Sequence, residues 1–299
     1  MSWSTTSDGV PRGYIDATGL RELWFHTGTA CNLQCPFCLE GSKPGNHRLQ
    51  QPTLEELKPY MDAALELGVE QFSFTGGEPF VNKAMVEILE YALDHRPVLV
   101  LTNGTKPLRK RMDAILSLLE KPHFLSYRIS FDFPDQAQHD ANRGEGNFTL
   151  ALQTLHDLHE AGFPVSIARL AKKEEDQAAI DQAYQTKVFA AAGVPEDTPI
   201  VAFPEFLPPG SHPGGVPEIT ENCMTTYHTE ESRANFMCSF SRMIVKSDDN
   251  IRVYACTLVD DDAQYDLGGD LNAALEARVR LGHHRCFSCF AYGASCSEA

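Results

Sequence analysis

Short β-rich runs alternate with helical patterns through the first two-thirds of the chain, and this alternation constrains the fold more than any other feature. The six apolar or β-branched runs are Leu23–Thr27, Gln71–Thr75, Val98–Thr102, Leu125–Phe131, Val165–Leu170 and Ile200–Phe203. Strands that are separated by helices predict an α/β protein with a parallel sheet, because each helix returns the chain to the same end of the sheet. A complete eight-unit barrel usually needs about 250 residues, so six units predict a partial (β/α)6 TIM-like barrel.

The segments between the runs carry the 3.6-residue periodicity of amphipathic helices. These segments are residues 54–65, 85–92, 112–119, 148–161 and 178–191. Thr53 followed by Glu56 predicts a capping box, and Gly68 and Gly162 stand where helices would end. In barrels of this kind, chemistry takes place at the carboxyl ends of the strands, so the residues after each run are candidate site residues.

The alternating pattern stops near residue 208. Leu207–Pro217 is rich in proline and glycine and is typical of a linker. Beyond it, Met243–Val245 and Ile251–Tyr254 predict a β-hairpin, and Leu271–Leu281 predicts a helix before a cysteine-rich tail. We therefore expect an N-terminal extension over residues 1–21, a barrel over 22–208 and a small C-terminal domain over 209–299.

The composition is that of an acidic globular protein. A net charge of −16 repels nucleic acid, so we expect no nucleic-acid partner; the charge either favours a cationic small molecule or simply confers solubility. No apolar run approaches the ~18–20 residues that span a bilayer, and residues 1–19 lack the apolar core of a signal peptide. These features predict a cytoplasmic protein without a membrane partner, in which nine cysteines serve metal binding or catalysis rather than disulfides.

Three cysteines follow the first run closely. Cys31, Cys35 and Cys38 are separated by three and then two residues, so one short loop can wrap their thiolates around a cluster. Thiolates are soft ligands suited to iron–sulfur chemistry. Three ligands leave one iron of a cubane without a protein ligand, and an open position is typical of a catalytic rather than a structural metal site.

A glycine-rich loop follows the second run. Gly76 and Gly77 allow the backbone to approach a ligand closely, Glu78 can accept a hydrogen bond from an ammonium group, and Pro79 ends the motif. By itself this is a common loop sequence. Its place after the second strand, next to the expected cysteine loop, makes it a candidate binding element.

Together the two loops resemble the signature of the radical S-adenosylmethionine (SAM) superfamily, over roughly residues 22–206. The resemblance implies that Cys31, Cys35 and Cys38 hold a [4Fe–4S] cluster whose open iron binds the methionine part of SAM. It also implies that Glu78 orients the SAM amino group and that Phe37 meets the adenine. The cofactors would then supply a 5′-deoxyadenosyl radical, which takes a hydrogen atom from an unactivated carbon.

The resemblance extends to further positions at strand ends, where a turn or cap role is the alternative in each case. Thr102 and Asn103 would line the pocket, Ser130 and Asp132 would lie near the ribose, and Arg143 would pair with the SAM carboxylate. Arg169, on an otherwise apolar strand, faces either inward, to the SAM pocket, or outward.

Six of the nine cysteines lie outside the first loop, and one fully ligated cluster takes four of them. Cys238 and Cys256 bracket the hairpin, and Cys286 and Cys289 form a CxxC after a helix. This plan resembles the twitch domain, a short form of the SPASM domain, which implies a second, auxiliary [4Fe–4S] cluster. A structural zinc site is the alternative, and Cys296 could replace Cys256 as the fourth ligand.

The two spare thiols, Cys223 and Cys296, bear on the reaction outcome. A thiol that returns a hydrogen atom to the opposite face gives epimerisation, whereas an electron lost to the auxiliary cluster gives dehydrogenation. The chain resembles twitch enzymes of both kinds that act on aminocyclitols and aminoglycosides, and two spare thiols favour an epimerase. We expect a polar, polycationic small-molecule substrate and a flavodoxin- or ferredoxin-type reductant. The alternatives are a radical modifier of peptides and a non-catalytic iron–sulfur or zinc protein.

Overall fold

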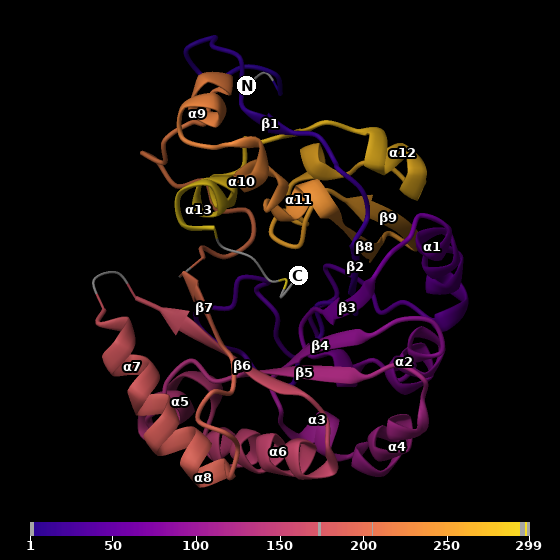
Figure 1. The fold of residues 1–299 in the computed structure, drawn as a ribbon, viewed down its shortest axis with the longest axis vertical. Helices are drawn as coiled ribbons and strands as arrows, with labels where there is room; N and C mark the ends of the chain where they lie inside the picture. Colours follow the sequence, from indigo (N-terminus) through magenta and orange to yellow (C-terminus); the bar gives the residue numbers. More distant parts are fainter. Residues whose placement is uncertain (1–2, 173–174, 205, 294–296, 298–299) are drawn as a thin grey trace.

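An eight-stranded sheet organises the computed structural model, which describes all residues except 1–2, 173–174, 205, 294–296 and 298–299 (Figure 1). The strand order is β7-β6-β5-β4-β3-β2-β8-β9. The six parallel strands of the expected barrel are β2 (Glu22–His26), β3 (Gln71–Thr75), β4 (Val98–Thr102), β5 (Leu125–Ser130), β6 (Val165–Ala171) and β7 (Ile200–Pro204). The α/β class and the partial-barrel architecture are confirmed.

Helices pack on the outer face of these strands. They are α1 (Leu54–Glu66), α2 (Met85–Leu93), α3 (Lys106–Arg109), α4 (Met112–Ser117), α5 (Gln136–Arg143), α6 (Asn147–Ala161), α7 (Gln177–Tyr184) and α8 (Ala190–Ala192). On α1, Leu57 and Met61 are buried in one apolar cluster with Phe72 and Phe74 of β3. The predicted capping box at Thr53 is present, so this helix begins where the sequence indicates.

The sheet continues past the linker. Strand β8 (Ser241–Ser247) pairs parallel with β2, and β9 (Asn250–Tyr254) pairs antiparallel with β8. The predicted hairpin is therefore real, and it joins the barrel sheet rather than forming a separate sheet. The expected boundary near residue 208 separates stretches of sequence, but the sheet itself crosses it.

The predicted helix over Leu271–Leu281 is too long. Helix α12 (Leu271–Glu276) ends early, and β10 (Val279–Arg280) pairs instead with β1 (Tyr14–Ile15) of the N-terminal extension. Arg278 also lies over the Tyr14 ring, 3.6 Å from its centroid. Long-range pairing and this cation–π contact thus outweigh the helical periodicity of the segment.

The C-terminal segment covers the inner face of the sheet. Its remaining helices are α9 (Glu221–Thr226), α10 (Glu230–Ala234), α11 (Met237–Phe240) and α13 (His284–Tyr292). Trp24 of β2 and Leu99 of β4 share a buried cluster with Met237 and Phe240 of α11. The barrel and the C-terminal segment therefore have a common core, and their junction lies at the strand ends that carry the candidate residues.

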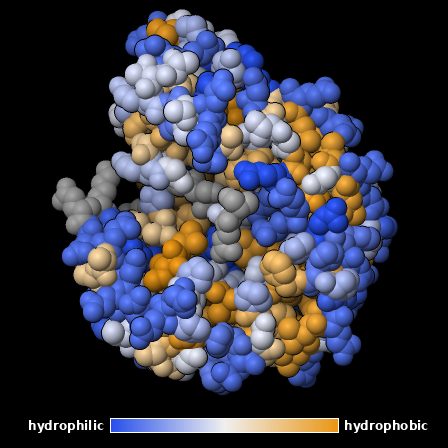
Figure 2. All heavy atoms as spheres, viewed as in Figure 1, coloured by the Kyte–Doolittle hydropathy of each residue, from blue (hydrophilic) through white to orange (hydrophobic). Residues whose placement is uncertain are grey.

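Hydrophilic side chains cover much of the surface in the view of Figure 2, with apolar patches between them. This distribution agrees with the high content of acidic residues in the sequence. Among the described residues, no helix is both long and apolar enough to cross a membrane.

Candidate functional site

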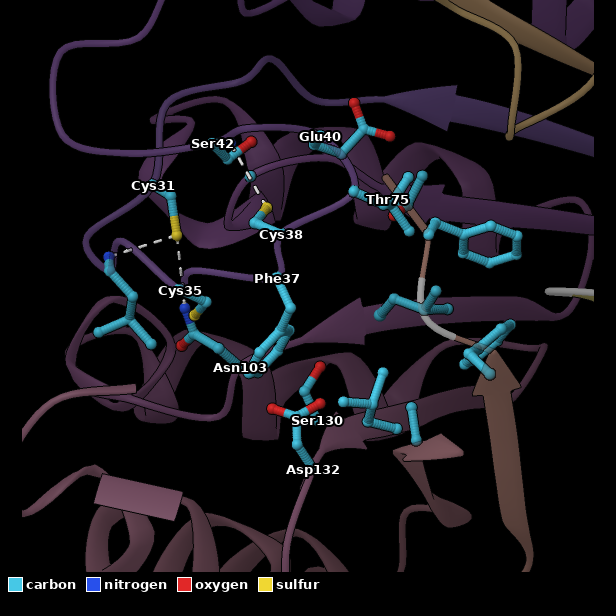
Figure 3. Close-up of a pocket in the computed structure, with 18 of the residues that line it drawn as sticks. Cys31, Cys35, Phe37, Cys38, Glu40, Ser42, Thr75, Asn103, Ser130 and Asp132 are labelled. Carbon is cyan, nitrogen blue, oxygen red and sulfur yellow. Dashed lines mark hydrogen bonds between the residues drawn. The ribbon is translucent and has the colours of Figure 1, made fainter. Parts of the chain in front are cut away.

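The loop after β2 brings Cys31, Cys35 and Cys38 to one cavity of about 200 Å³ (Figure 3). A turn closes the loop, with the Cys38 amide donating to the Cys35 carbonyl at 3.2 Å. The Leu33 amide donates to Cys31 Sγ at 3.3 Å, and the Ser42 amide donates to Cys38 Sγ at 3.4 Å. Amide donors of this kind stabilise cluster-bound thiolates, so the donor set fits an iron–sulfur cluster.

Burial affects the protonation of two of these thiols, Cys31 and Cys35. It raises the pKa of Cys31 to about 12 and also raises the pKa of Cys35. The neighbouring thiolates raise both pKa values further, because like charges repel. Without metal, Cys31 and Cys35 are therefore protonated near neutral pH, and cluster binding must release their protons.

The glycine loop after β3 is packed directly against the cysteine loop. The Gly77 amide donates to the Gly28 carbonyl at 2.9 Å, and the Glu78 amide donates to the Ala30 carbonyl at 3.1 Å. A Cβ atom on Gly77 would lie 2.4 Å from the Ala30 oxygen, and Gly76 has a φ of +142°. Both glycines line the cavity, but the close approach that requires them is to the backbone of the cysteine loop.

Glu78 lies behind the cavity wall. Its carboxylate accepts hydrogen bonds from Thr102 Oγ1 at 2.9 Å, from the Asn103 amide at 2.8 Å and from the Phe80 amide at 3.2 Å. Burial nevertheless raises the pKa of Glu78 to about 7. Neither Glu78 nor Pro79 is among the described lining residues, so in this structure Glu78 ties the loop after β3 to the end of β4.

The opposite wall gathers most of the other predicted residues. Asp132 and Arg143 form a partly buried ion pair, and the Arg143 guanidinium lies 6.0 Å from the centroid of the Phe37 ring. Figure 3 shows Phe37 between the cysteines and the pair of Ser130 and Asp132. The predicted residues that line this one cavity with the cysteines are Phe37, Gly76, Gly77, Thr102, Asn103, Ser130, Asp132, Arg143 and Arg169.

The sequence left open whether Arg169 faces inward or outward, and in the structure it faces inward, to the cavity. It is 2% exposed, lines the cavity, forms an ion pair with Glu175 and lies 3.3 Å from Asp181. Two carboxylates therefore balance its buried charge.

Sequence reasoning missed the apolar part of the cavity. Its walls include Leu101, Leu170, Phe203, Phe206 and Leu258. Leu101 and Phe203 stand near the ends of their strands, which is a signal that could have been used. Leu258 lies in a loop after β9, and no sequence pattern brings that loop to the barrel mouth.

The second set of cysteines lines a separate small cavity. Cys238 of α11, Cys256 after β9, and Cys286 and Cys289 of α13 all face it. Burial raises the pKa of Cys238, Cys256 and Cys286. Four thiols from three segments thus line one small cavity, called here the tetrathiolate site, and thiolates are ligands of both [4Fe–4S] clusters and zinc.

The described residues give no support to the prediction that Cys223 reaches the substrate pocket. Cys223 lies on α9, and its Sγ is 3.1 Å from Oγ1 of Thr220, the residue that caps this helix. The Gly13 amide bonds to the Ile219 carbonyl, which holds the start of α9 against the N-terminal extension. Among the described residues that line the cavity, Cys223 does not appear. Cys296, the other spare thiol, lies outside the described residues.

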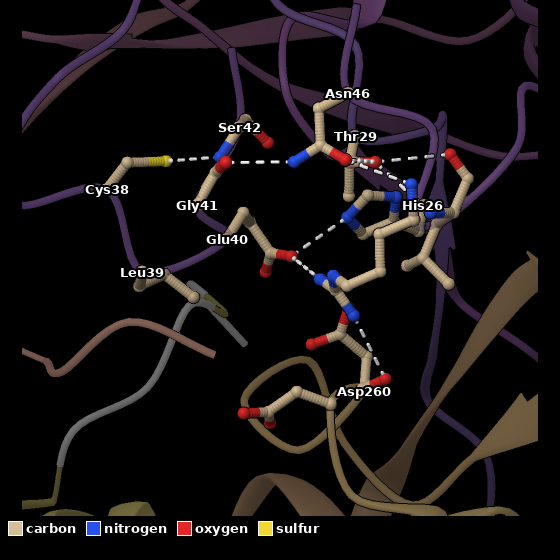
Figure 4. A network of polar contacts seen from close by, with 12 residues as sticks. His26, Thr29, Cys38, Leu39, Glu40, Gly41, Ser42, Asn46 and Asp260 are labelled. Atoms are coloured by element: carbon tan, nitrogen blue, oxygen red, sulfur yellow. Dashed lines mark hydrogen bonds and ion pairs between the residues drawn. The ribbon is translucent and has the colours of Figure 1, made fainter. Parts of the chain in front are cut away.

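A network of polar side chains lies next to the end of the cysteine loop (Figure 4). Arg48 donates to Glu40 at 2.7 Å and to Asp260 at 2.9 Å, and His26 Nε2 lies 3.2 Å from Glu40. His26 Nδ1 accepts from the Gly28 amide, so Nε2 carries the ring proton. The ligand atoms of His26, Glu40 and Asp260 lie within 4.8 Å of one another, and Arg48 donates to both carboxylates, so the group forms an ion-pair network in this structure.

Comparison with known proteins gives the following similarities. A family model described as the Radical SAM superfamily matches residues 25–185. Mycofactocin maturase MftC of Mycolicibacterium smegmatis is 30% identical over 135 residues, which cover 45% of this chain and 33% of the relative. The subtilosin biosynthesis protein AlbA of Bacillus subtilis is 32% identical over 140 residues, which cover 46% of this chain and 30% of the relative. The matches thus span about a third of these relatives' length.

Among solved structures, Streptococcus suis SuiB bound to S-adenosylmethionine superposes with a TM-score of 0.62 at 13% identity. The superposition covers 87% of this chain and 66% of SuiB. At this identity the likeness concerns the fold, and it extends beyond the barrel into the C-terminal segment.

Proposed function

Because the chain belongs to the radical SAM superfamily, we propose that it cleaves SAM reductively at a cluster held by Cys31, Cys35 and Cys38. When bound, the cluster and SAM supply a 5′-deoxyadenosyl radical that removes a hydrogen atom from an unactivated carbon. The observation that carries the proposal is the single cavity, which joins the three thiols to the glycine loop and to the ends of β4, β5 and β6.

The chain's own residues divide the cavity into two parts. Phe37, Ser130, Asp132 and Arg143 lie beside the cysteines, where they would contact SAM. The Asp132 carboxylate fixes the direction of the Arg143 guanidinium, which leaves its other donors for a carboxylate of the ligand. The apolar residues beyond them would exclude water from the reacting carbon.

We further propose that Cys238, Cys256, Cys286 and Cys289 hold an auxiliary [4Fe–4S] cluster. Leu258 lines both the main cavity and the tetrathiolate site, so the two sites are adjacent and share this residue as part of their walls. Such a cluster, held by these four thiols, would supply an acceptor for one electron from the substrate. This arrangement favours net two-electron oxidation, in which the substrate loses one hydrogen atom, one proton and one electron.

Epimerisation is the second candidate. It needs a thiol near the substrate, and among the described lining residues the only cysteines are the three of the cluster loop. The candidate therefore depends on Cys296. An aminoglycoside substrate draws little support from the cavity, because its two described carboxylates, Glu40 and Asp132, are already paired with arginines. The apolar wall favours an uncharged reacting group, such as a peptide side chain, and the relatives include a maturase and a bacteriocin biosynthesis protein.

Product analysis in deuterated water distinguishes the two outcomes. Oxidation predicts a product two hydrogens lighter than the substrate, with no solvent deuterium on carbon. Epimerisation predicts a product with the same formula as the substrate, except that one deuterium replaces the hydrogen at the inverted carbon. The deuterium arises because a thiol exchanges its hydrogen with solvent. The second pattern, together with its loss in Cys296→Ser, would overturn the oxidation proposal.

A further inference from the structure

One buried arginine connects the segments that carry both sets of cysteines. Arg285 is 1% exposed, directly precedes Cys286 on α13 and lines the tetrathiolate cavity. Neither its position in the sequence nor any motif marks it as unusual. Its contacts set it apart.

The Arg285 guanidinium donates to three main-chain carbonyls from three segments. Nη1 bonds to the Leu258 oxygen at 3.0 Å, and Nη2 bonds to the oxygens of Leu39 at 3.0 Å and Leu207 at 2.6 Å. Leu39 follows Cys38 directly, and Leu258 is two residues beyond Cys256. One side chain thus contacts the end of the first cysteine loop and the loop that carries a cysteine of the second set.

The charge of Arg285 is only partly balanced nearby. Asp261 Oδ1 lies 3.5 Å from Nη1, and Asp261 also accepts from the Gly210 amide at 2.9 Å and lies 3.4 Å from His283 Nε2. A buried cation is costly unless it is paired and hydrogen bonded. Arginine suits this position because its planar fork donates in several fixed directions, which lysine cannot reproduce.

We propose that Arg285 is a positioning residue shared by the two cluster sites, and that its positive charge raises the reduction potentials of both clusters. The inference rests on the proposed auxiliary cluster. Each reduction adds negative charge to a cluster, and cluster potentials depend on the net charge and hydrogen bonding around the sulfurs. A cation fixed between the two loops therefore favours the reduced form at both sites.

The test is an EPR-monitored redox titration of the reconstituted full chain, without substrate. In Arg285→Met, both midpoint potentials should shift to more negative values. In Asp261→Asn, which removes the balancing anion, both should shift to more positive values. Arg285→Lys keeps the charge but loses the fork, so its potentials should lie between those of Arg285→Met and the wild type.

Arg96→Met is the matched control. Arg96 also donates to main-chain carbonyls, those of Val69 and His95, but it lies beside the amino ends of β3 and β4, opposite to the cysteine loops. Its potentials should equal those of the wild type.

Three results would overturn the inference: a shift at only one cluster, shifts of the same sign in Arg285→Met and Asp261→Asn, or equal shifts in Arg96→Met. If Arg285→Met fails to bind iron, Asp261→Asn and Arg285→Lys still decide the sign. If the wild type binds about eight irons and the variants have the midpoint potentials of the wild type, this inference is contradicted but the auxiliary cluster is not. A wild-type protein with about four irons and bound zinc contradicts the auxiliary cluster, and the inference with it.

Discussion

At the scale of single residues, Gly77 shows how backbone packing supports a metal site. A Cβ atom here would meet the Ala30 oxygen at 2.4 Å, so a side chain must push the cysteine loop away. We expect Gly77→Ala to lose about four irons per chain, because a cubane needs all three thiolates of the loop. Iron analysis after reconstitution checks this. Gly214→Ala is the control, since a Cβ at Gly214 has no described atom within 4 Å; equal iron in both variants would contradict the packing argument.

His139 makes stability depend on pH. The ring is 1% exposed and packs against Phe131 and Phe148, and burial lowers its pKa to about 4. The unfolded chain, with a pKa near 6.5, therefore binds the proton more readily, and folding stability is lost as the pH falls from about 6.5 to 4. Between pH 7 and pH 5 the loss should be about 2 kcal/mol.

Denaturant unfolding at these two pH values measures this contribution. His139→Phe should show a smaller loss of unfolding free energy than the wild type, because phenylalanine cannot take up a proton. An equal loss in both proteins would show that other groups cause the acid sensitivity.

Spacing alone predicted the three cysteines of the first loop as a group, because ligands so close in sequence can reach one cluster whatever the rest of the fold. The strand-end residues Ser130 and Asp132 could also be placed, since parallel strands end at one edge. Arg285 and the Glu40–Arg48–Asp260 network could not. Their partners come from segments that are far apart in sequence, and no local pattern specifies such contacts.

At the scale of elements, helix α13 delivers two of the four thiols of the second site. Cys286 and Cys289 are three residues apart, so they lie on one face of the helix. Replacing both with alanine should reduce the iron content from about eight to about four per chain while cleavage of SAM without substrate continues. Metal analysis of the purified protein tests this. Zinc in the wild type that disappears in the variant, at constant iron, would show that the site is structural zinc.

Local patterns predicted most elements of the barrel, because each strand and helix buries its own apolar face. They failed where a distant segment decides the outcome. Residues 279–280 continue a helical pattern but pair with β1, and β8 joins the barrel sheet beside β2. Both pairings connect residues more than two hundred positions apart, which periodicity cannot reveal.

At the scale of the whole molecule, the cavity belongs to both parts of the chain. The wall that we propose to contact SAM comes from the barrel, whereas Thr257 and Leu258 come from the segment after β9. The sequence predicted the first wall through the order of strands and loops. It left the apolar wall, the position of the tetrathiolate site beside the cavity and the position of α9 with Cys223 to the structure, because these depend on how the C-terminal segment packs over the sheet.

The central claim is that Cys31, Cys35 and Cys38 form a SAM-cleaving site. Its most direct test is the formation of 5′-deoxyadenosine after anaerobic reconstitution, addition of dithionite and SAM, and chromatography. Alanine at any one of these three positions should abolish the product, because two thiolates hold a cubane cluster poorly. Cys223→Ala should retain it, because that thiol lies on α9 away from the described cavity lining. Wild-type amounts of 5′-deoxyadenosine in any of the three loop variants would contradict the account.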